Sequence, residues 1–335
     1  MFYYHDIPRI GKLLGVIGGQ IKQDAFILDH VLYAEGKPDF SDPGRLRIFQ
    51  NSETWGGYDM DAWFRVEFAV PEQMAGRPIR LELFTDREGR WEAVNPQLLV
   101  YVDGRIVQGM DTHHREVKIT DGAPAGQKIT VDFDAWSGMV HEDQTWSGDE
   151  NAPCHFKVQA FCPDLRTEKL FYDLRVPYDT ASLLPKDNPD RLMITRSLVE
   201  AVNLLDLREL PSKAFSQSVE AAIAYLETEF YQKVCGKAEL PVCYAIGHTH
   251  IDVAWQWTFA HTRRKAARSF ATALALMDEY PDYMFMSSQP QLYQYVKEDH
   301  PEEYERIRER IREGRWCADG GMWLEADCNL TSGES

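Results

Sequence analysis

The sequence predicts a multidomain protein with an antiparallel β-sandwich, then helices, then the first strands and helices of an α/β domain. From about Val31, apolar and polar residues alternate in short runs separated by turn residues, which is typical of a sandwich. From about Ala181 the apolar residues recur with the period of a helix. After Pro241, short apolar runs alternate with segments of helical length, and this alternation indicates a parallel sheet.

These patterns divide the chain into four segments. A short N-terminal helix is predicted over residues 7–21, because Ile10, Leu14 and Ile17 fall on one side of it. The predicted segments are an N-terminal helix and lead-in (1–30), the β-sandwich (31–180), a helical linker (181–238) and the start of the α/β domain (239–335).

Short alternating runs make up the predicted sandwich. Phe64, Val66 and Phe68 alternate with polar residues, and Asp103-Gly104 lies between two apolar runs, which is a strong hairpin signal. Further strands are predicted where apolar residues alternate again, at Phe156, Val158, Ala160, Leu170, Tyr172, Leu174 and Val176.

Strands and helices alternate in the last hundred residues. Pro301 suits the first turn of the last helix, and Gly314 suits its C-terminal end. The predicted elements are a strand at 242–247, a helix at 260–279, a strand at 283–287, paired helices at 290–314 and a strand at 315–324.

Composition excludes several kinds of partner. The net charge of −17 would repel phosphate backbones and anionic membranes, so nucleic-acid and membrane binding are not expected. No apolar run approaches the length of a membrane span. The six cysteines form no C-x-x-C pair, and scattered thiols in a chain of this size indicate a reducing, cytoplasmic location.

The segment Gly247–Trp255 holds the densest set of candidate metal ligands. It follows the apolar run 242–246, which is interpreted as a buried strand. If the backbone stays extended, His248, His250 and Asp252 project from one face, and two imidazoles with a carboxylate suit a divalent ion, zinc above all. The alternative is a strand-end histidine cluster held by ordinary hydrogen bonds.

Two acidic residues at a later strand end extend this set. Asp327 and Glu325 follow the strand predicted at 315–324, and neighbouring strand ends lie about 5 Å apart. A site that needs three protein ligands is satisfied by any three of the set His248, His250, Asp252 and Asp327.

Two other groups have both a functional and an ordinary interpretation. Trp255 suits stacking on a sugar ring, but it and Trp257 equally suit a core. The polar cluster Asp111–Arg115 follows the predicted hairpin, where a solvated loop or a contact with the α/β domain is favoured over a ligand site.

Three blocks in order resemble one enzyme family. GHTHIDVAW from Gly247, SQPQLY from Ser288 and WCADGGMWLEADCNLTSGES from Trp316 are similar to glycoside hydrolase family 38, the retaining α-mannosidases, and most of all to their cytosolic and bacterial branch. The resemblance is specific over about 241–335 and looser before it. It implies a galactose-binding-like jelly roll for the sandwich and a seven-stranded β/α barrel for the catalytic domain.

The resemblance also implies roles for individual residues. His250, Asp252 and Asp327 would bind the metal, Asp327 would be the catalytic nucleophile, and Trp255 would lie beneath the bound sugar. His248 and Glu325 would support these groups from outside the ligand set. One divalent ion is expected, with zinc ahead of cobalt or manganese. The expected partner is an α-mannoside oligosaccharide, and a homo-oligomer of the full-length enzyme is compatible with the resemblance.

The family's second metal-binding histidine and its general acid lie downstream of the SGES motif, which ends this sequence. The expectation is therefore an N-terminal portion of an α-mannosidase that is inactive alone. Two other functions stay open at this point: a carbohydrate-binding sandwich without activity of its own, and a metal-dependent polysaccharide deacetylase, which also uses His and Asp at strand ends.

Overall fold

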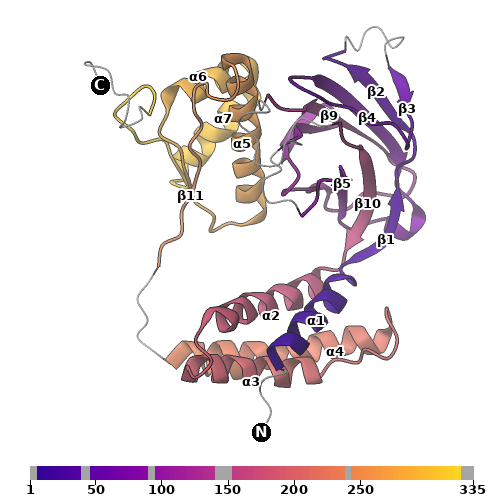
Figure 1. The fold of residues 1–335 in the computed structure, drawn as a ribbon, viewed down its shortest axis with the longest axis vertical. Coiled ribbons are helices and arrows are strands. Elements are labelled where there is room, and N and C mark those ends of the chain that lie inside the picture. Colours follow the sequence, from indigo (N-terminus) through magenta and orange to yellow (C-terminus); the bar gives the residue numbers. More distant parts are fainter. Residues whose placement is uncertain (1–5, 39–45, 90–94, 140–152, 238–242, 326–335) are drawn as a thin grey trace. The chain divides into compact units, whose positions relative to one another are not determined.

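The computed structural model describes residues 6–38, 46–89, 95–139, 153–237 and 243–325. Contacts divide the chain into two units, each built from two stretches of sequence (Figure 1). The helical unit comprises Met1–Ala25 and Phe161–Cys243, and the mixed unit comprises Phe26–Ala160 and Tyr244–Ser335. Within the described residues, no helix is long and apolar enough to cross a membrane.

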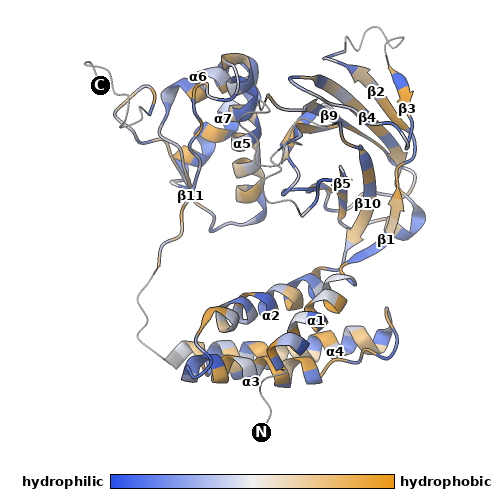
Figure 2. Ribbon diagram, in the orientation of Figure 1, coloured by the Kyte–Doolittle hydropathy of each residue, from blue (hydrophilic) through white to orange (hydrophobic). Residues whose placement is uncertain are grey.

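Four α-helices share one apolar core in the helical unit. Apolar residues recur along these helices (orange in Figure 2), and the fully buried ones include Ile10 of the first helix and Leu198 of the third. The helices are α1 (Asp6–Gly18), α2 (Leu165–Leu183), α3 (Pro189–Asn203) and α4 (Lys213–Tyr225), and α4 continues into a π-helical segment, η5 (Leu226–Gln232), before a short 3₁₀ turn, η6 (Cys235–Lys237).

Helix α2 corrects the sequence prediction, which placed a strand over Leu170–Val176. Leu170 and Leu174 are fully buried, whereas Tyr172 is 57% exposed and Val176 is 63% exposed. In a strand all four would share one face, but in a helix the first pair and the second pair lie on different sides. Asp164 begins the helix by accepting hydrogen bonds from the backbone N–H groups of residues 166 and 167.

The first part of the mixed unit is a two-sheet region, residues 31–160, together with the end of the strand before it. Its six-stranded sheet is antiparallel throughout, in the order β3-β2-β4-β9-β6-β7, and the four-stranded sheet has the order β1-β10-β5-β8. The strands are β1 (Lys22–Ile27), β2 (Val31–Glu35), β3 (Arg47–Phe49), β4 (Asp61–Ala69), β5 (Ile79–Phe84), β6 (Gln97–Val102), β7 (Arg105–Met110), β8 (Glu116–Thr120), β9 (Lys128–Trp136) and β10 (Lys157–Pro163), with a 3₁₀ turn, η3 (Glu72–Met74), after β4.

The predicted hairpin is confirmed between β6 and β7. Asp103 and Gly104 both have positive φ, 49° and 80°, as a two-residue turn of this handedness requires. Asp103 tolerates this conformation better than most side chains do, and glycine adopts it without steric cost. In the same two-sheet region, Phe64 of β4 stacks on Phe156 with ring centroids 3.8 Å apart, and both rings are buried.

The second part of the mixed unit is a βα segment, residues 244–325. Three short parallel strands in the order β11-β12-β13 pair Gly247 with Phe285 and Phe285 with Trp316. This confirms the predicted βα alternation and parallel sheet. The elements are β11 (Gly247–His248), α5 (Phe259–Glu279), β12 (Phe285–Met286), α6 (Pro290–Asp299), α7 (Pro301–Arg312) and β13 (Trp316–Cys317).

The strands of this segment are shorter than the sequence predicted. Residues 243–246, the described part of the predicted strand at 242–247 that precedes β11, do not form a buried strand: Tyr244 is 85% exposed and Ile246 is 54% exposed. Among the described residues β11 is an edge strand, with β12 on one side, so no described neighbour covers these two side chains. The strand expected over 315–324 ends at Cys317, because the chain then turns to pass close to Ser288.

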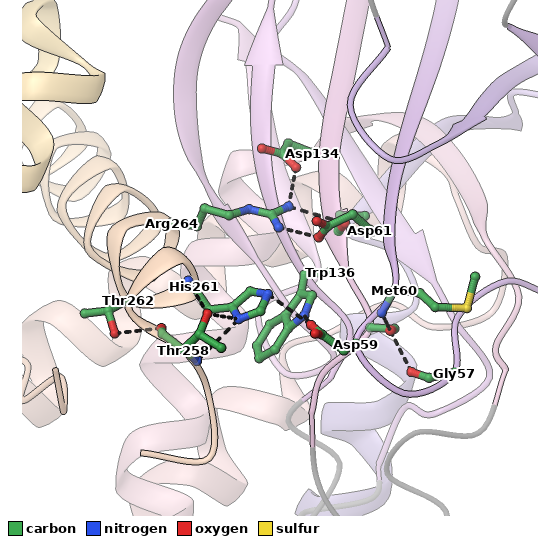
Figure 3. A network of polar contacts seen from close by, with 12 residues as sticks. Gly57, Asp59, Met60, Asp61, Asp134, Trp136, Thr258, His261, Thr262 and Arg264 are labelled. Atoms are coloured by element: carbon green, nitrogen blue, oxygen red, sulfur yellow. Dashed lines mark hydrogen bonds and ion pairs between the residues drawn. The ribbon is translucent and has the colours of Figure 1, made fainter. Parts of the chain in front are cut away.

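Helix α5 joins the βα segment to the two-sheet region (Figure 3). His261 stacks on Trp136 with ring centroids 4.3 Å apart, and its Nε2 lies 3.1 Å from Asp59. One turn further on, Arg264 forms ion pairs with Asp61 of β4 and Asp134 of β9. The helix is therefore fixed against the six-stranded sheet by aromatic and charged contacts.

Candidate functional site

His250 lies between two carboxylates just after β11. Its Nε2 is 3.1 Å from Oδ1 of Asp252, and its Nδ1 contacts the Glu325 carboxylate. The pKa of His250 is raised, chiefly by the hydrogen bond to Glu325, with Asp252 adding to the effect and partial burial opposing it. The imidazole can therefore donate to Glu325 through Nδ1 and leave Nε2 directed at Asp252.

Glu325 is held in turn by the segment after β12. Ser288 donates its hydroxyl to the Glu325 carboxylate, and this hydrogen bond is the largest cause of the lowered pKa of Glu325, followed among the lowering causes by His250. The indole N–H of Trp323 donates to the Gln291 side chain over 2.9 Å. Glu325 is thus positioned by the start of α6 and not by a continuous strand.

Gly320 makes this arrangement sterically feasible. A Cβ atom at that position would lie 2.5 Å from the carbonyl oxygen of Ser288, a contact that backbone atoms cannot relieve. The residues between Cys317 and Glu325 can therefore pass directly beside Ser288, which brings the Glu325 carboxylate to His250.

Two side chains, one buried and one partly buried, fix the backbone that carries the His250–Asp252 pair. The Gln289 side chain, 2% exposed, donates to the carbonyl of Ile251 over 3.1 Å. The Trp257 indole donates to the carbonyl of Asp252, also over 3.1 Å. Sequence reasoning gave neither residue a role at the site. In the sequence, the feature that could have pointed to Gln289 is its place as a polar residue between a predicted strand and Pro290, which starts α6.

The donor atoms present are compatible with one divalent ion. Nitrogen and oxygen ligands bind zinc at about 2.0–2.2 Å, so two of them on one ion are about 3 to 3.5 Å apart. The 3.1 Å between His250 Nε2 and Asp252 Oδ1 falls in this range. Glu325 on Nδ1 is the kind of partner that orients a metal-bound histidine. The described residues contain no complete group of three such ligands.

The other sequence-predicted residues are placed differently. His248 ends β11, and the strand stops before Thr249, so the continuous strand predicted through Asp252 is not formed, although the His248 charge still contributes to the lowered pKa of Glu325. Trp255 is 66% exposed and packs edge-on against Trp257, with centroids 5.3 Å apart. Asp327 lies outside the described residues.

Comparison with known proteins shows which class of enzyme the chain resembles. The chain is 31% identical to alpha-mannosidase 2C1 of Homo sapiens over 99% of its own length and 31% of that protein. It is 31% identical to an alpha-mannosidase of Saccharomyces cerevisiae over 82% of its length and 26% of the relative, and 28% identical to alpha-mannosidase G of Dictyostelium discoideum over 84% and 26%. These relatives are glycoside hydrolases.

The segment that identifies the family also contains the residues of the candidate site. Residues 241–335 match the glycosyl hydrolases family 38 N-terminal domain, and the chain belongs to that family. It spans about a quarter to a third of the length of these relatives.

Solved structures add little to this assignment. A β-glucuronidase of Ruminococcus gnavus, at 14% identity, covers 42% of this chain and 30% of its own with a TM-score of 0.28, a likeness too weak to support a conclusion.

Proposed function

We propose that this chain is part of a metal-dependent retaining α-mannosidase, which removes terminal α-mannosyl residues from oligosaccharides through a glycosyl-aspartate intermediate. The observation that carries the proposal is the 3.1 Å separation of His250 Nε2 and Asp252 Oδ1, backed by Glu325, inside the segment that matches family 38. One divalent ion, zinc ahead of cobalt or manganese, would supply binding and orientation of sugar hydroxyls.

In this proposal His250, Asp252 and Asp327 would bind the ion. His248 and Glu325 would orient these ligands without binding the ion themselves. The Asp327 carboxylate attacks the anomeric carbon while the leaving oxygen takes a proton from a general acid, and water then cleaves the glycosyl ester. The resemblance assigns that acid to residues beyond Ser335. Trp255, whose ring is exposed, provides an apolar surface under the sugar.

Glu325 and Ser288 control the proton on His250. A histidine that binds a metal through Nε2 must be neutral and carry its proton on Nδ1. Glu325 accepts there, and Ser288 in turn donates to Glu325, so the chain of contacts favours this tautomer and fixes the ring plane. Gln289 and Trp257 hold the neighbouring backbone carbonyls, which keeps Asp252 at its distance from the imidazole.

We also propose a specific fold for each part of the mixed unit. The antiparallel two-sheet region would be a jelly roll of the galactose-binding type, and the parallel strands β11, β12 and β13 would be the first three of a seven-stranded β/α barrel. The proposed location is the cytoplasm, which is compatible with the five described cysteines being free thiols.

The test uses the full-length protein and an aryl α-mannoside. We expect hydrolysis with the α-anomer as first product, and loss of turnover in Asp327→Asn without loss of folding, because an amide cannot form the glycosyl ester. A fluorinated mannosyl inactivator followed by denaturing mass spectrometry should label Asp327. Label on Glu325 would reverse the assignment of the nucleophile.

Two other outcomes would replace the proposed function. Release of acetate from an acetylated polysaccharide, with no cleavage of mannosides, would indicate a deacetylase. Mannoside binding that survives in a protein without the βα segment, again with no hydrolysis, would indicate a carbohydrate-binding module.

A further inference from the structure

The mixed unit contains a pocket of about 470 Å³ between the two-sheet region and the βα segment. Asp111 and His114, in the loop between β7 and β8, are among the residues that line it on the two-sheet side. His248, His250, Trp257 and Lys265 are among the residues on the other side. A volume of this size is in the range of small-molecule sites, about 300–1,000 Å³.

This pocket lies beside the candidate site without coinciding with it. His250 and Trp257 border both, whereas Asp252, Trp255 and Glu325 do not line the pocket. If one group of a ligand lies at Asp252, the adjoining group on the far side of His250 would therefore lie in the pocket. The candidate site and the pocket therefore adjoin each other at His250 and Trp257.

The polar groups in the pocket suit a neutral sugar. Asp111 is held in place by the backbone N–H groups of His113 and His114, at 2.8 and 2.7 Å, and lies 3.0 Å from the His114 ring nitrogen. A carboxylate accepts hydrogen bonds from hydroxyl groups, and an imidazole can donate or accept. Across the pocket, Lys265 Nζ lies over the Trp257 ring, 4.1 Å from its centroid.

The wall that carries Asp111 is anchored to the βα segment. The backbone N–H of Gly109, two residues before Asp111, donates to the Thr272 hydroxyl over 3.0 Å. The Gln97 side chain accepts from Lys265 over 2.8 Å and from Arg268 over 2.6 Å. Together with the contacts of Figure 3, these bonds tie β6 and β7 to α5, so the spacing between Asp111 and His250 is set by the packing of folded elements.

We infer that the two-sheet region is part of the substrate site: Asp111 and His114 bind the sugar that adjoins the terminal mannosyl residue. This inference rests on the proposed function. An enzyme that removes terminal residues binds a single mannosyl residue on one side of the cleaved bond and the rest of the substrate on the other side, so the adjoining pocket receives the leaving-group sugar. The polar cluster Asp111–Arg115, for which the sequence favoured a solvated loop or a contact with the α/β domain over a ligand site, then contains specificity determinants.

The test compares two substrates on the full-length enzyme. α-Mannosyl fluoride has no leaving-group sugar, and α-linked mannobiose has one. In Asp111→Asn and in His114→Ala we expect kcat/KM for mannobiose to fall about 10- to 100-fold, as for lost hydrogen bonds to charged or polar groups, with kcat/KM for the fluoride unchanged. Asparagine can still accept the two backbone hydrogen bonds, so the loop keeps its shape.

A matched control and a binding measurement complete the experiment. His113→Ala changes an exposed neighbour that does not line the pocket, and it should behave as wild type. Calorimetry in the Asp327→Asn background, which is expected not to cleave the substrate, should show that mannobiose binds more tightly than mannose, and that adding Asp111→Asn removes the difference. Unchanged mannobiose kinetics, an equal loss on the fluoride, or an equal loss in His113→Ala would each overturn the inference. If wild type cleaves neither substrate, the proposed function fails, and the calorimetry alone decides about the pocket.

Discussion

At the scale of single residues, His250 connects the most distant parts of the candidate site. Asp252 is two residues away and Glu325 is 75 residues away, yet both carboxylates reach its ring. The metal proposal therefore depends on this imidazole far more than on His248, whose spacing is equally regular.

The metal content of the full-length enzyme tests whether His250 matters more for metal binding than His248. His250→Ala should remove tightly bound divalent ion, because it deletes a proposed ligand. Glu325→Gln and His248→Ala should each weaken binding by about 10- to 100-fold, as for groups that orient ligands. Elemental analysis after dialysis against graded chelator gives the three values. Equal loss from the two histidine variants would place His248 among the ligands.

Lys265 makes stability depend on pH. Burial lowers its pKa to about 7, with Arg268 acting in the same direction and Asp111 opposing. Between pH 7 and the ordinary value of 10.5, the unfolded chain binds more protons here than the folded chain, so stability rises with pH across this window. The cost of burying the ammonium is complete below pH 7 and disappears near pH 10.5.

Lys265→Met should therefore stabilise the mixed unit at pH 6–7 by about 1–4 kcal/mol and converge with wild type near pH 10.5. Urea unfolding at several pH values, followed by tryptophan fluorescence, measures the difference. Lys128→Met, at an exposed position of β9, is the control and should leave the curve unchanged. A constant offset at all pH values would contradict the shifted pKa.

At the scale of elements, α5 has two charged faces with different energetic roles. Arg264 faces the six-stranded sheet and pairs with Asp61 and Asp134, the latter only 14% exposed. Its neighbour Arg263 pairs with Asp299 and Glu298 at the surface. The two arginines are adjacent in sequence, but the helical turn directs them to different partners.

Arg264→Met should cost about 2–5 kcal/mol in the free energy of unfolding of the mixed unit, because it removes the arginine that pairs with the largely buried Asp134 carboxylate. Arg263→Met should cost under about 1 kcal/mol, since exposed ion pairs contribute little. Methionine keeps the chain length and helix propensity in both variants. Denaturant midpoints measured by tryptophan fluorescence compare them, and similar losses would mean that α5 is not anchored through Arg264.

At the scale of the whole molecule, the two units have separate cores. The apolar cluster of the helical unit is drawn entirely from α1, α2, α3, α4 and η5. All nine tryptophans of the sequence lie between residues 55 and 323 in the stretches of the mixed unit, so the helical unit contains none. Fluorescence therefore reports one unit, while far-ultraviolet circular dichroism reports helices of both.

Leu198→Ala should lower the stability of the helical unit by about 2–5 kcal/mol, the usual cost of a cavity at a fully buried leucine. The dichroism transition should shift to lower denaturant, and the tryptophan transition should stay where it is. Met193→Ala, an exposed position on the same helix, should shift neither. A parallel shift of both signals would show that the two units unfold as one.

Local chemistry made several features predictable from the sequence. The Asp103-Gly104 hairpin follows from two residues that tolerate positive φ. The start of α7 follows from Pro301, and its end lies close to Gly314, whose φ is 76°. His250 and Asp252 lie close together because they are only two positions apart in the sequence. In each case the deciding interactions lie within a few residues of one another.

Only the tertiary structure decided the rest. Leu170–Val176 has an alternation that fits a strand, but burying Leu170 and Leu174 against α1, α3 and α4 favours the helix. Glu325 reaches His250 because Gly320 lets the chain pass Ser288. Asp111 borders the same pocket as His250 because α5 is bonded to β7. These contacts join residues far apart in sequence, and their energies come from packing and from hydrogen bonds across elements, which no local pattern encodes.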